Sequence, residues 1–510
     1  MVSAAVDVGA ATKPAQAVEL AFTEAFRRHE SSHPAIREAH CLAAMYPSLC
    51  LPIRDGDLLA GRVAQPAVGF HLEQEAGGFY YHCDAEALKR EIAQPDMAPS
   101  YRAELQEMVD FWSTRTSDRR MDQLLTEPMR EATTNRIAEM GFRMAGALLD
   151  FDKLVRLGIP GLAAEVRTAA GRRTADTESV ALYEGMLASL DVLVSVCRHY
   201  AAQAREQAAG SPVEGRTLEL SRMAVCLDAI TERPPACLQE GLQLTWLYAL
   251  LASVLNHGRM DVYLGDLYVA DVDSGRLTEA QALALLQSQW RLIAERPVTF
   301  NGRIIVGGRG RRNAANADRF ALAAMEATRT VHEAVPQLTL RCCRGMDPAL
   351  MARALEVIGE GRTFPMLYND DVNVPAVAKA FGVPESDAEQ YLPYGCGEYA
   401  LGHRAIGSPN CSLNTLKALE AVLHDGRDAL TGEPLGLATG ELSSFVTFDG
   451  LLAAYRRQVE HHARQLVLRH AVEYRMEYRN LFVRVGGFSA RFVDLPRETQ
   501  QDLLRRTLYE

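Results

Sequence analysis

Apolar residues between positions 85 and 210 recur every three or four residues, and positions 181–207 show this period most clearly. A period of this length places one apolar stripe along a helix. The first half of the chain is therefore predicted to form an outer layer of helices.

Beyond position 300, short apolar runs alternate with helical patterns. The runs at 303–306, 338–342 and 366–368 are typical of strands, and 316–330 and 348–361 are typical of the helices between them. This alternation predicts an α/β fold.

Local signals place the ends of two further helices. Thr278 can cap the helix that runs through Glu295, because its hydroxyl can accept a hydrogen bond from a first-turn N–H. A second helix over 414–423 should end at Asp425 and Gly426.

The composition is that of an ordinary soluble globular protein. The chain has 510 residues, of which 48% are hydrophobic and 23% charged, so it can bury a large core. This length suggests several domains but equally allows one large barrel. A net charge of −11 argues against nucleic acid and anionic membranes as partners.

The cellular location is predicted to be the cytoplasm. Residues 1–17 are small and polar and should form a disordered tail without the pattern of a secretory signal. No run reaches the apolar length of a membrane span. The ten cysteines show no CxxC spacing, which favours free thiols over disulfides or a zinc site.

The main candidate for chemistry is the hexapeptide 394–399, Tyr-Gly-Cys-Gly-Glu-Tyr. Glycines flank Cys396 and can adopt a positive φ, so the thiol could be held at the tip of a tight turn, two residues from Glu398. The alternative from these residues alone is a buried, unreactive cysteine in a connecting loop.

A second stretch, residues 481–495, reads Leu-Phe-Val-Arg-Val-Gly-Gly-Phe-Ser-Ala-Arg-Phe-Val-Asp-Leu. It resembles the C-terminal signature of the glycyl radical enzymes, and the resemblance assigns the radical to Gly487. The hexapeptide resembles the thiyl loop of the same family, which makes Cys396 the catalytic cysteine and Glu398 its acid or base. Segments at 36–62 and 233–278 follow the family's order.

This resemblance implies a radical mechanism. A glycine C–H bond and a thiol S–H bond are close in strength, so hydrogen can pass between Gly487 and Cys396 in a closed, dry cavity. It also implies no tightly bound cofactor, oxygen sensitivity, anaerobic function and a homodimer. The radical would be installed by a separate radical S-adenosylmethionine activating enzyme that carries an iron–sulfur cluster.

The fold that the resemblance implies is a pyruvate formate-lyase-like barrel of two half-sheets surrounded by helices. Family members have a long stretch where this chain passes directly from the helix with His461 and His462 into the radical motif, so the barrel should be truncated. The predicted division is a tail at 1–17, a helical and barrel domain at 18–465 and a radical segment at 466–510.

The expected reaction is lyase- or dehydratase-like cleavage of a C–O, C–N or C–C bond in a small organic substrate. The glutamate two residues after the cysteine is shared with the family's dehydratases, carbon–nitrogen lyases and decarboxylases. The additional histidine and aspartate of the diol dehydratases are not evident at 146–151 and 408–410. His403 or Arg404 could contact an anionic or polar substrate, or lie on the loop surface. The alternative function is a degenerate or radical-carrier protein without turnover.

Two further patterns have structural interpretations. His29 and His33 match the H-E-x-x-H zinc pattern, but Pro34 should break the helix that zinc binding needs. Gly307 to Gly310 lacks the residues of a phosphate loop and is interpreted as a turn at a strand end.

Two pairs of adjacent residues are also open to a functional interpretation. Cys342 and Cys343 lie well before the thiyl loop and are interpreted as packing residues, because neighbouring strand residues point to opposite faces. Arg259 and Asp261 could bind substrate, but a structural ion pair is the expected role.

Overall fold

The computed structural model describes residues 17–71, 80–124, 137–140, 148–172, 176–296, 302–394, 397–402, 404, 411–477, 482–485 and 488–491. These residues form two compact units, one from residues 1–113 and 146–407, the other from 114–145 and 408–510. The tail predicted at 1–17 lies outside the described residues except for Ala17, and the three-part division remains a prediction.

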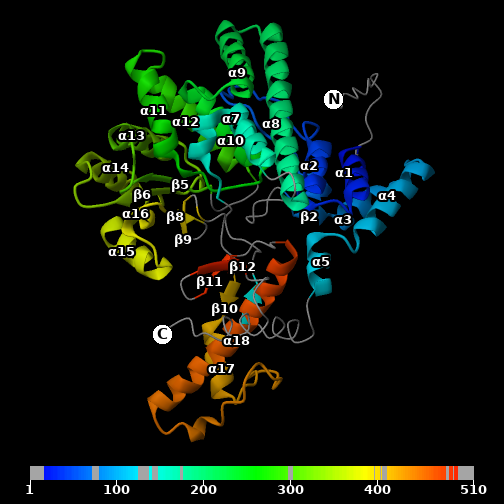
Figure 1. Ribbon diagram of the computed structural model, residues 1–510, viewed down its shortest axis with the longest axis vertical. Helices are drawn as coiled ribbons and strands as arrows, with labels where there is room; N and C mark the ends of the chain where they lie inside the picture. Colours follow the sequence, from blue (N-terminus) through cyan, green and yellow to red (C-terminus); the bar gives the residue numbers. More distant parts are fainter. Residues whose placement is uncertain are drawn as a thin grey trace. The chain divides into compact units, whose positions relative to one another are not determined.

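The first unit begins with two helices and a small antiparallel ribbon (Figure 1). Aromatic rings of Phe22, Phe26 and Trp112 pack together here, and the Trp112 indole donates to Thr23 Oγ1 at 2.9 Å. This bond satisfies the indole N–H, as a buried tryptophan usually requires. The elements are α1 (Ala17–His29), α2 (Pro34–Met45), β1 (Val68–Phe70), β2 (Tyr81–Cys83), α3 (Ala85–Ile92) and α4 (Pro99–Trp112).

A layer of long helices follows, as the apolar period predicts. It consists of α7 (Phe151–Gly171), α8 (Thr177–Gly210), α9 (Glu214–Glu232) and α10 (Leu238–Leu251). Helix α8 packs against α9, α2 and α7. Its apolar positions are spread around the helix rather than along the single stripe expected at 181–207, because a helix with several neighbours needs more than one apolar face.

Helix α8 also corrects one expectation from the sequence. By length and composition it is apolar enough to cross a membrane, and a third of its most apolar window (33%) is buried. A helix that contacts several others inside a folded unit needs apolar residues on more than one side, so the same composition also suits a packing helix. The predicted cytoplasmic location is not tested by this finding.

The centre of the first unit is a four-stranded parallel sheet in the order β4-β5-β6-β7. Helices α11 and α13 pack on β5, and Figure 1 shows α13 and α14 beside the strands. The predicted strands and intervening helices are confirmed. The elements are β4 (Gly258–Arg259), α11 (Met260–Asp273), α12 (Glu279–Ala294), β5 (Ile304–Gly307), α13 (Ala314–Thr330), β6 (Leu338–Cys342), α14 (Pro348–Gly359), β7 (Met366–Asn369), α15 (Asp370–Phe381) and α16 (Glu385–Ala388).

Burial explains the composition of these strands. All four residues of β5 and the first four of β6 are buried, as expected for parallel strands that are covered on both faces. The cap predicted at Thr278 is present: its side chain accepts from the Gln281 N–H, and the Gln281 side chain accepts from the Thr278 N–H.

The second unit is built around a long helix, α18. Helix α17 begins after its cap Asn414 and ends before Gly426, which has φ +79°, as the sequence predicts. The elements are α5 (Ser117–Leu124), β3 (Ala138–Met140), β10 (Cys411–Leu413), α17 (Thr415–Leu423), a 3-10 turn at Leu442–Ser444, α18 (Phe448–Glu477), β11 (Phe482–Val485) and β12 (Phe488–Arg491).

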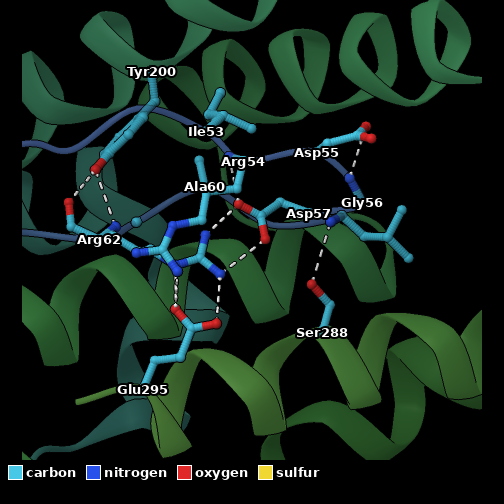
Figure 2. Close-up of polar contacts among 12 residues, drawn as sticks. Ile53, Arg54, Asp55, Gly56, Asp57, Ala60, Arg62, Tyr200, Ser288 and Glu295 are labelled. Atoms are coloured by element: carbon cyan, nitrogen blue, oxygen red, sulfur yellow. Dashed lines mark hydrogen bonds and ion pairs between the residues drawn. The ribbon is translucent and has the colours of Figure 1, made fainter. Parts of the chain in front are cut away.

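An irregular segment at residues 53–62 is fixed to α8 and to the α12 region by polar contacts (Figure 2). Arg62 donates to Glu295 from Nε at 2.5 Å and from Nη2 at 3.1 Å, and it also pairs with Asp57. Tyr200 Oη donates to the Arg62 carbonyl at 2.6 Å, and Leu58 N donates to Ser288 Oγ at 3.2 Å. These hydrogen bonds satisfy polar groups of a segment whose backbone has no helix or strand partner.

Removing the Glu295 carboxylate should weaken this attachment. The bond from Arg62 holds the pKa of Glu295 below its usual value, so its stabilising contribution is complete above the pKa of the unfolded chain and is lost as pH falls through the folded-state pKa. Because Glu295 is 39% exposed, solvent screening limits the effect, and we expect Glu295→Gln to lower the free energy of unfolding at pH 7 by about 0.5–1 kcal/mol.

Urea unfolding at a series of pH values measures this difference. Glu206→Gln, which removes a carboxylate from the exposed surface of α8, is the matched control and should change little. A Glu295→Gln deficit that stays constant into strongly acidic solution would contradict the assigned ion pair.

Candidate active site

The hexapeptide predicted to carry the chemistry forms the turn of a hairpin. Strands β8 (Tyr391–Tyr394) and β9 (Glu398–Leu401) are antiparallel, and Tyr394 pairs with Glu398. Three residues therefore connect the strands, and Cys396 is the middle one. Gly395 and Cys396 themselves lie outside the described residues, as does the side chain of Glu398, whose backbone begins β9.

Gly397 has the conformation that the sequence predicts. Its φ is +118°, and its N–H donates to the Tyr394 carbonyl at 2.8 Å. A Cβ at this position would lie 2.5 Å from the Tyr368 hydroxyl on β7. Glycine is therefore required twice, for the positive φ and for the close approach of the turn to the sheet.

The base of the hairpin rests on a fully buried ion pair. Arg341 of β6 and Asp370 at the start of α15 are both 0% exposed, with Arg341 Nη2 at 2.8 Å from Asp370 Oδ2 and Arg341 Nε at 2.9 Å from Oδ1. The Tyr391 hydroxyl donates to Asp370 Oδ1 at 2.7 Å. Every polar group of this pair thus has a partner, as buried charges require.

A cavity of about 450 Å³ lies beside the hairpin, within the size range of small-molecule sites. Residues from the start of α7, from β4 and from both ends of the hairpin line it. They are Leu148, Leu149, Asp150, Phe151, Asp152, His257, Gly258, Arg259, Val262, Tyr263, Gly310, Arg312, Gln390, Leu392, Gly402 and Arg404.

His257 is a buried polar side chain in this wall. Its ring is stacked with the rings of Phe151 and Trp246, at centroid distances of 6.0 and 6.3 Å. Within the described part of the chain, its Nδ1 has no hydrogen-bond partner. Burial lowers the pKa of His257 to about 3, with a smaller contribution from Arg296, so the imidazole is neutral near pH 7 and able both to donate and to accept.

The two substrate-contacting candidates are placed differently. Arg404 lines the cavity, but its Nη2 lies 2.8 Å from Asp387 Oδ2 and its side chain is 58% exposed, which favours the loop-surface alternative. His403 lies outside the described residues. Leu149, the residue before the Asp-Phe pair at 150–151, lines the cavity.

The second signature also forms a hairpin. Strands β11 and β12 are antiparallel, and Val485 pairs with Phe488. Gly486 and Gly487 are therefore the two residues between the strands, and both lie outside the described residues. Two-residue connections favour glycine because they need a positive φ. This hairpin belongs to the second compact unit and the cysteine hairpin to the first.

The zinc alternative finds no support in the structure. Helix α1 ends at His29, and the His33 Nδ1 accepts from the Ala35 N–H at 3.2 Å as the cap of α2. The two histidines are thus not on one helix, as Pro34 predicts. Among the described residues, no cluster of His, Cys, Asp and Glu has the arrangement of a metal site.

The cysteine pair and the glycine-rich segment have the structural roles expected. Cys342 donates from Sγ to the Tyr368 carbonyl at 3.3 Å, and burial raises the pKa of both Cys342 and Cys343. Gly307 ends β5 and is followed by a bend. The eight cysteines that the structure characterises are free thiols.

Arg259 and Asp261 have structural partners, although not each other. Arg259 donates to the carbonyls of Gly307 and Arg309 at 3.0 and 2.8 Å. Asp261 Oδ2 accepts from the Gly307 N–H at 2.8 Å and lies 3.4 Å from Arg311. The expected ion pair between Arg259 and Asp261 is therefore wrong. Asp261, in the first turn of α11, binds the backbone at the end of β5. Arg259 binds carbonyls at the end of β5 and in the turn after it.

Sequence reasoning missed the residues beneath the hairpin and the buried histidine. A signal for Arg341 was present, since a single arginine interrupts the apolar run 338–342 and a charge in a buried strand needs a partner. The identity of that partner, 29 residues away, depends on strand register.

Comparison with known proteins gives a consistent family assignment. The model of the family described as Pyruvate formate lyase-like matches residues 11–483. The probable dehydratase YbiW of Escherichia coli (strain K12) is 26% identical over 88% of this chain and 59% of its own length. The (2S)-3-sulfopropanediol dehydratase of Klebsiella oxytoca is 24% identical over 87% and 58%.

A solved structure shows the same fold. The hydroxyproline dehydratase of Clostridioides difficile, with trans-4-hydroxy-L-proline bound, superposes with a TM-score of 0.76 at 19% identity, over 90% of this chain and 62% of that chain. The chain therefore spans about three fifths of the length of these relatives.

Gly397→Ala should disturb the turn that holds Cys396. The positive φ costs an alanine about 1 kcal/mol, and contact with the Tyr368 hydroxyl should add roughly 1–2 kcal/mol. Gly361 is the matched control, because its φ is +87° but a Cβ there meets open space. Urea unfolding should show a larger loss for Gly397→Ala than for Gly361→Ala.

Tyr368→Phe removes the contacting oxygen and should recover part of the Gly397→Ala loss. Equal losses for the two glycine variants, with no recovery, would contradict the close packing of the turn against β7.

Proposed function

Because the chain belongs to the Pyruvate formate lyase-like family, we propose that it is a glycyl radical enzyme of the lyase or dehydratase type. Gly487 stores the radical, Cys396 abstracts hydrogen from the substrate and Glu398 acts as acid or base. The observation that carries the proposal is the hairpin pairing, since the predicted cysteine and glycine each fall in the short connection of a hairpin.

The reaction proceeds by hydrogen-atom transfer. The Gly487 radical takes the hydrogen of the Cys396 thiol, which forms a C–H bond, breaks the S–H bond and leaves a thiyl radical. The thiyl radical then takes a hydrogen atom from a substrate carbon. After the product radical regains that hydrogen from Cys396, the thiyl radical takes one back from Gly487, and the stored radical is restored.

Bond cleavage occurs at the stage of the substrate radical. A radical beside a hydroxyl, amino or carboxyl group loses its neighbouring group more readily when a base removes a proton or an acid supplies one. Glu398 is the first residue after the turn and the carboxylate nearest in sequence to Cys396. It accepts or supplies that proton.

The cavity beside the hairpin supports a small substrate. Its volume of about 450 Å³ is in the range of small-molecule sites. The neutral imidazole of His257 offers a hydrogen bond to a hydroxyl, carbonyl or amine without imposing a charge. Cleavage of a C–O, C–N or C–C bond is compatible with this wall.

The proposal includes specific partners and conditions. The polypeptide holds no cofactor tightly, and a radical S-adenosylmethionine activating enzyme with an iron–sulfur cluster installs the radical on Gly487. The protein is a cytoplasmic homodimer that works without oxygen, because oxygen destroys a carbon-centred radical.

A second candidate is a degenerate or radical-carrier protein that stores the radical without turnover. One observation favours it: the parallel sheet of the first unit has four strands in the part of the chain that the structure describes. One parallel sheet is less than the barrel of two half-sheets that the family resemblance implies.

Electron paramagnetic resonance separates these possibilities. After anaerobic incubation with an activating enzyme and S-adenosylmethionine, we expect a glycine-centred doublet in the wild type that is absent from Gly487→Ala. Cys396→Ala should keep the doublet and lose turnover by at least roughly 10³-fold, because no group remains to abstract hydrogen. Cys343→Ala is the matched thiol control and should keep both.

Turnover is screened with isethionate, 3-sulfopropanediol, trans-4-hydroxyproline, glycerol and 1,2-propanediol. A doublet without conversion of any of these or of related small alcohols and amines favours the radical carrier. The same doublet in Gly487→Ala, or its absence from the wild type when the activating enzyme is active on another family member, contradicts the proposal.

A further inference from the structure

The hairpin that carries Cys396 is held at its base by two buried arginines of the parallel sheet. Arg341 on β6 donates from Nη1 to the Tyr391 carbonyl and from Nη2 to the Glu389 carbonyl, each at 3.0 Å. Arg259 on β4 donates from Nη1 to the same Glu389 carbonyl at 3.3 Å. The sheet thereby holds the backbone at the point where the chain enters the hairpin.

Tyr391 is fixed by its side chain as well as by its backbone. The Arg341 guanidinium lies 3.9 Å from the centre of the Tyr391 ring, a distance at which a cation is attracted to the ring face. The Tyr391 hydroxyl and the Arg341 guanidinium both bind Asp370. Arginine, aspartate and tyrosine thus form a closed triangle, and the first residue of β8 has little freedom to shift or rotate.

The turn after β5 allows this triangle to be packed so closely. A Cβ at Gly308 would lie 2.5 Å from Asp370 Oδ2, and one at Gly310 would lie 2.6 Å from Gln390 Nε2. Both glycines have a positive φ. The Arg309 N–H donates to Asp370 Oδ2 at 2.7 Å. The glycine-rich segment therefore supports the hairpin base.

A buried ion pair adds little net stability, because the cost of removing both charges from water offsets most of their attraction. What a fully bonded pair provides is one defined geometry. That property matters where a thiol must exchange hydrogen with a backbone carbon, since a displacement of about 1 Å can slow a reaction by roughly a hundredfold.

We propose that Arg341, together with Asp370, is a positioning residue that fixes the Cys396 turn for hydrogen transfer. Arg341 contacts the hairpin base through the carbonyls of Tyr391 and Glu389. The proposal rests on the proposed function of Cys396 and Gly487, and it assigns a role to residues that neither hairpin signature contains.

Another arginine of the same sheet provides a matched control. Arg303 is 1% exposed and donates to Thr339 Oγ1 at 2.8 Å and to Gln337 Oε1 at 3.1 Å. These partners lie at the start of β6, whereas Arg341 lies near its end. Arg303→Met therefore removes an equally buried cation from the other end of the strands.

Hydrogen exchange in D₂O gives a readout that needs no substrate. The thiol hydrogen of Cys396 exchanges with solvent, whereas hydrogen on carbon does not. Each transfer between Cys396 and Gly487 can therefore replace the remaining hydrogen of the radical carbon by deuterium, which collapses the paramagnetic resonance doublet to a singlet. The rate of collapse measures how well the two residues are placed.

We expect activated Arg341→Met to show a normal initial doublet. That doublet should collapse to a singlet roughly 10- to 100-fold more slowly than the wild-type doublet. The doublet of Arg303→Met should collapse at the wild-type rate, even if this variant loses as much thermal stability as Arg341→Met. Because Arg341→Met leaves Asp370 buried and unpaired, the double variant Arg341→Met with Asp370→Asn, which has no lone charge, should slow the collapse similarly.

Wild-type rates in both Arg341 variants would overturn the proposal. Equal slowing in Arg303→Met would also overturn it, because it would indicate a general effect of sheet stability. A wild-type doublet that does not collapse, or that collapses equally in Cys396→Ala, contradicts the proposed function itself and removes the basis of this inference.

Discussion

The geometry of the candidate site depends on one interaction, the buried ion pair of Arg341 and Asp370. It joins the end of β6, the start of α15 and the first residue of the cysteine hairpin through bonds of 2.7–3.0 Å. Both charges are fully enclosed, so neither can leave without exposing the other to an apolar interior. A rigid sheet thus determines where a short, glycine-rich turn lies.

This arrangement suits the chemistry that the family assignment implies. A thiyl radical reacts with almost any hydrogen donor that it meets, so selectivity must come from position and from exclusion of water. The turn supplies position through Gly397, which packs against Tyr368. The cavity beside the hairpin adds an imidazole that burial keeps neutral and that stacks with two aromatic rings.

Local sequence patterns predicted much of the fold. Strands β5, β6 and β7, the capping box at Thr278 and the end of α17 follow from residues that contact others close in sequence, and the glycine beside Cys396 has the positive φ expected of it. The hairpins could be anticipated only through the family signatures. Pairing across long separations was not predictable: Arg259 contacts a carbonyl 130 positions away, and the apolar faces of α8 are explained by packing against α2, α7 and α9.

The central proposal is that hydrogen passes directly between Cys396 and Gly487. Gly487→Cys places a second thiol at the radical position, and two cysteines form a disulfide only when their Cα atoms lie within about 7 Å. Mild oxidation followed by peptide mass spectrometry measures this, with Ser489→Cys in β12 as the control. The account predicts a disulfide between Cys396 and position 487 that forms faster and more completely than one to position 489. Free thiols at both Cys396 and position 487, or disulfides to unrelated cysteines, would contradict it.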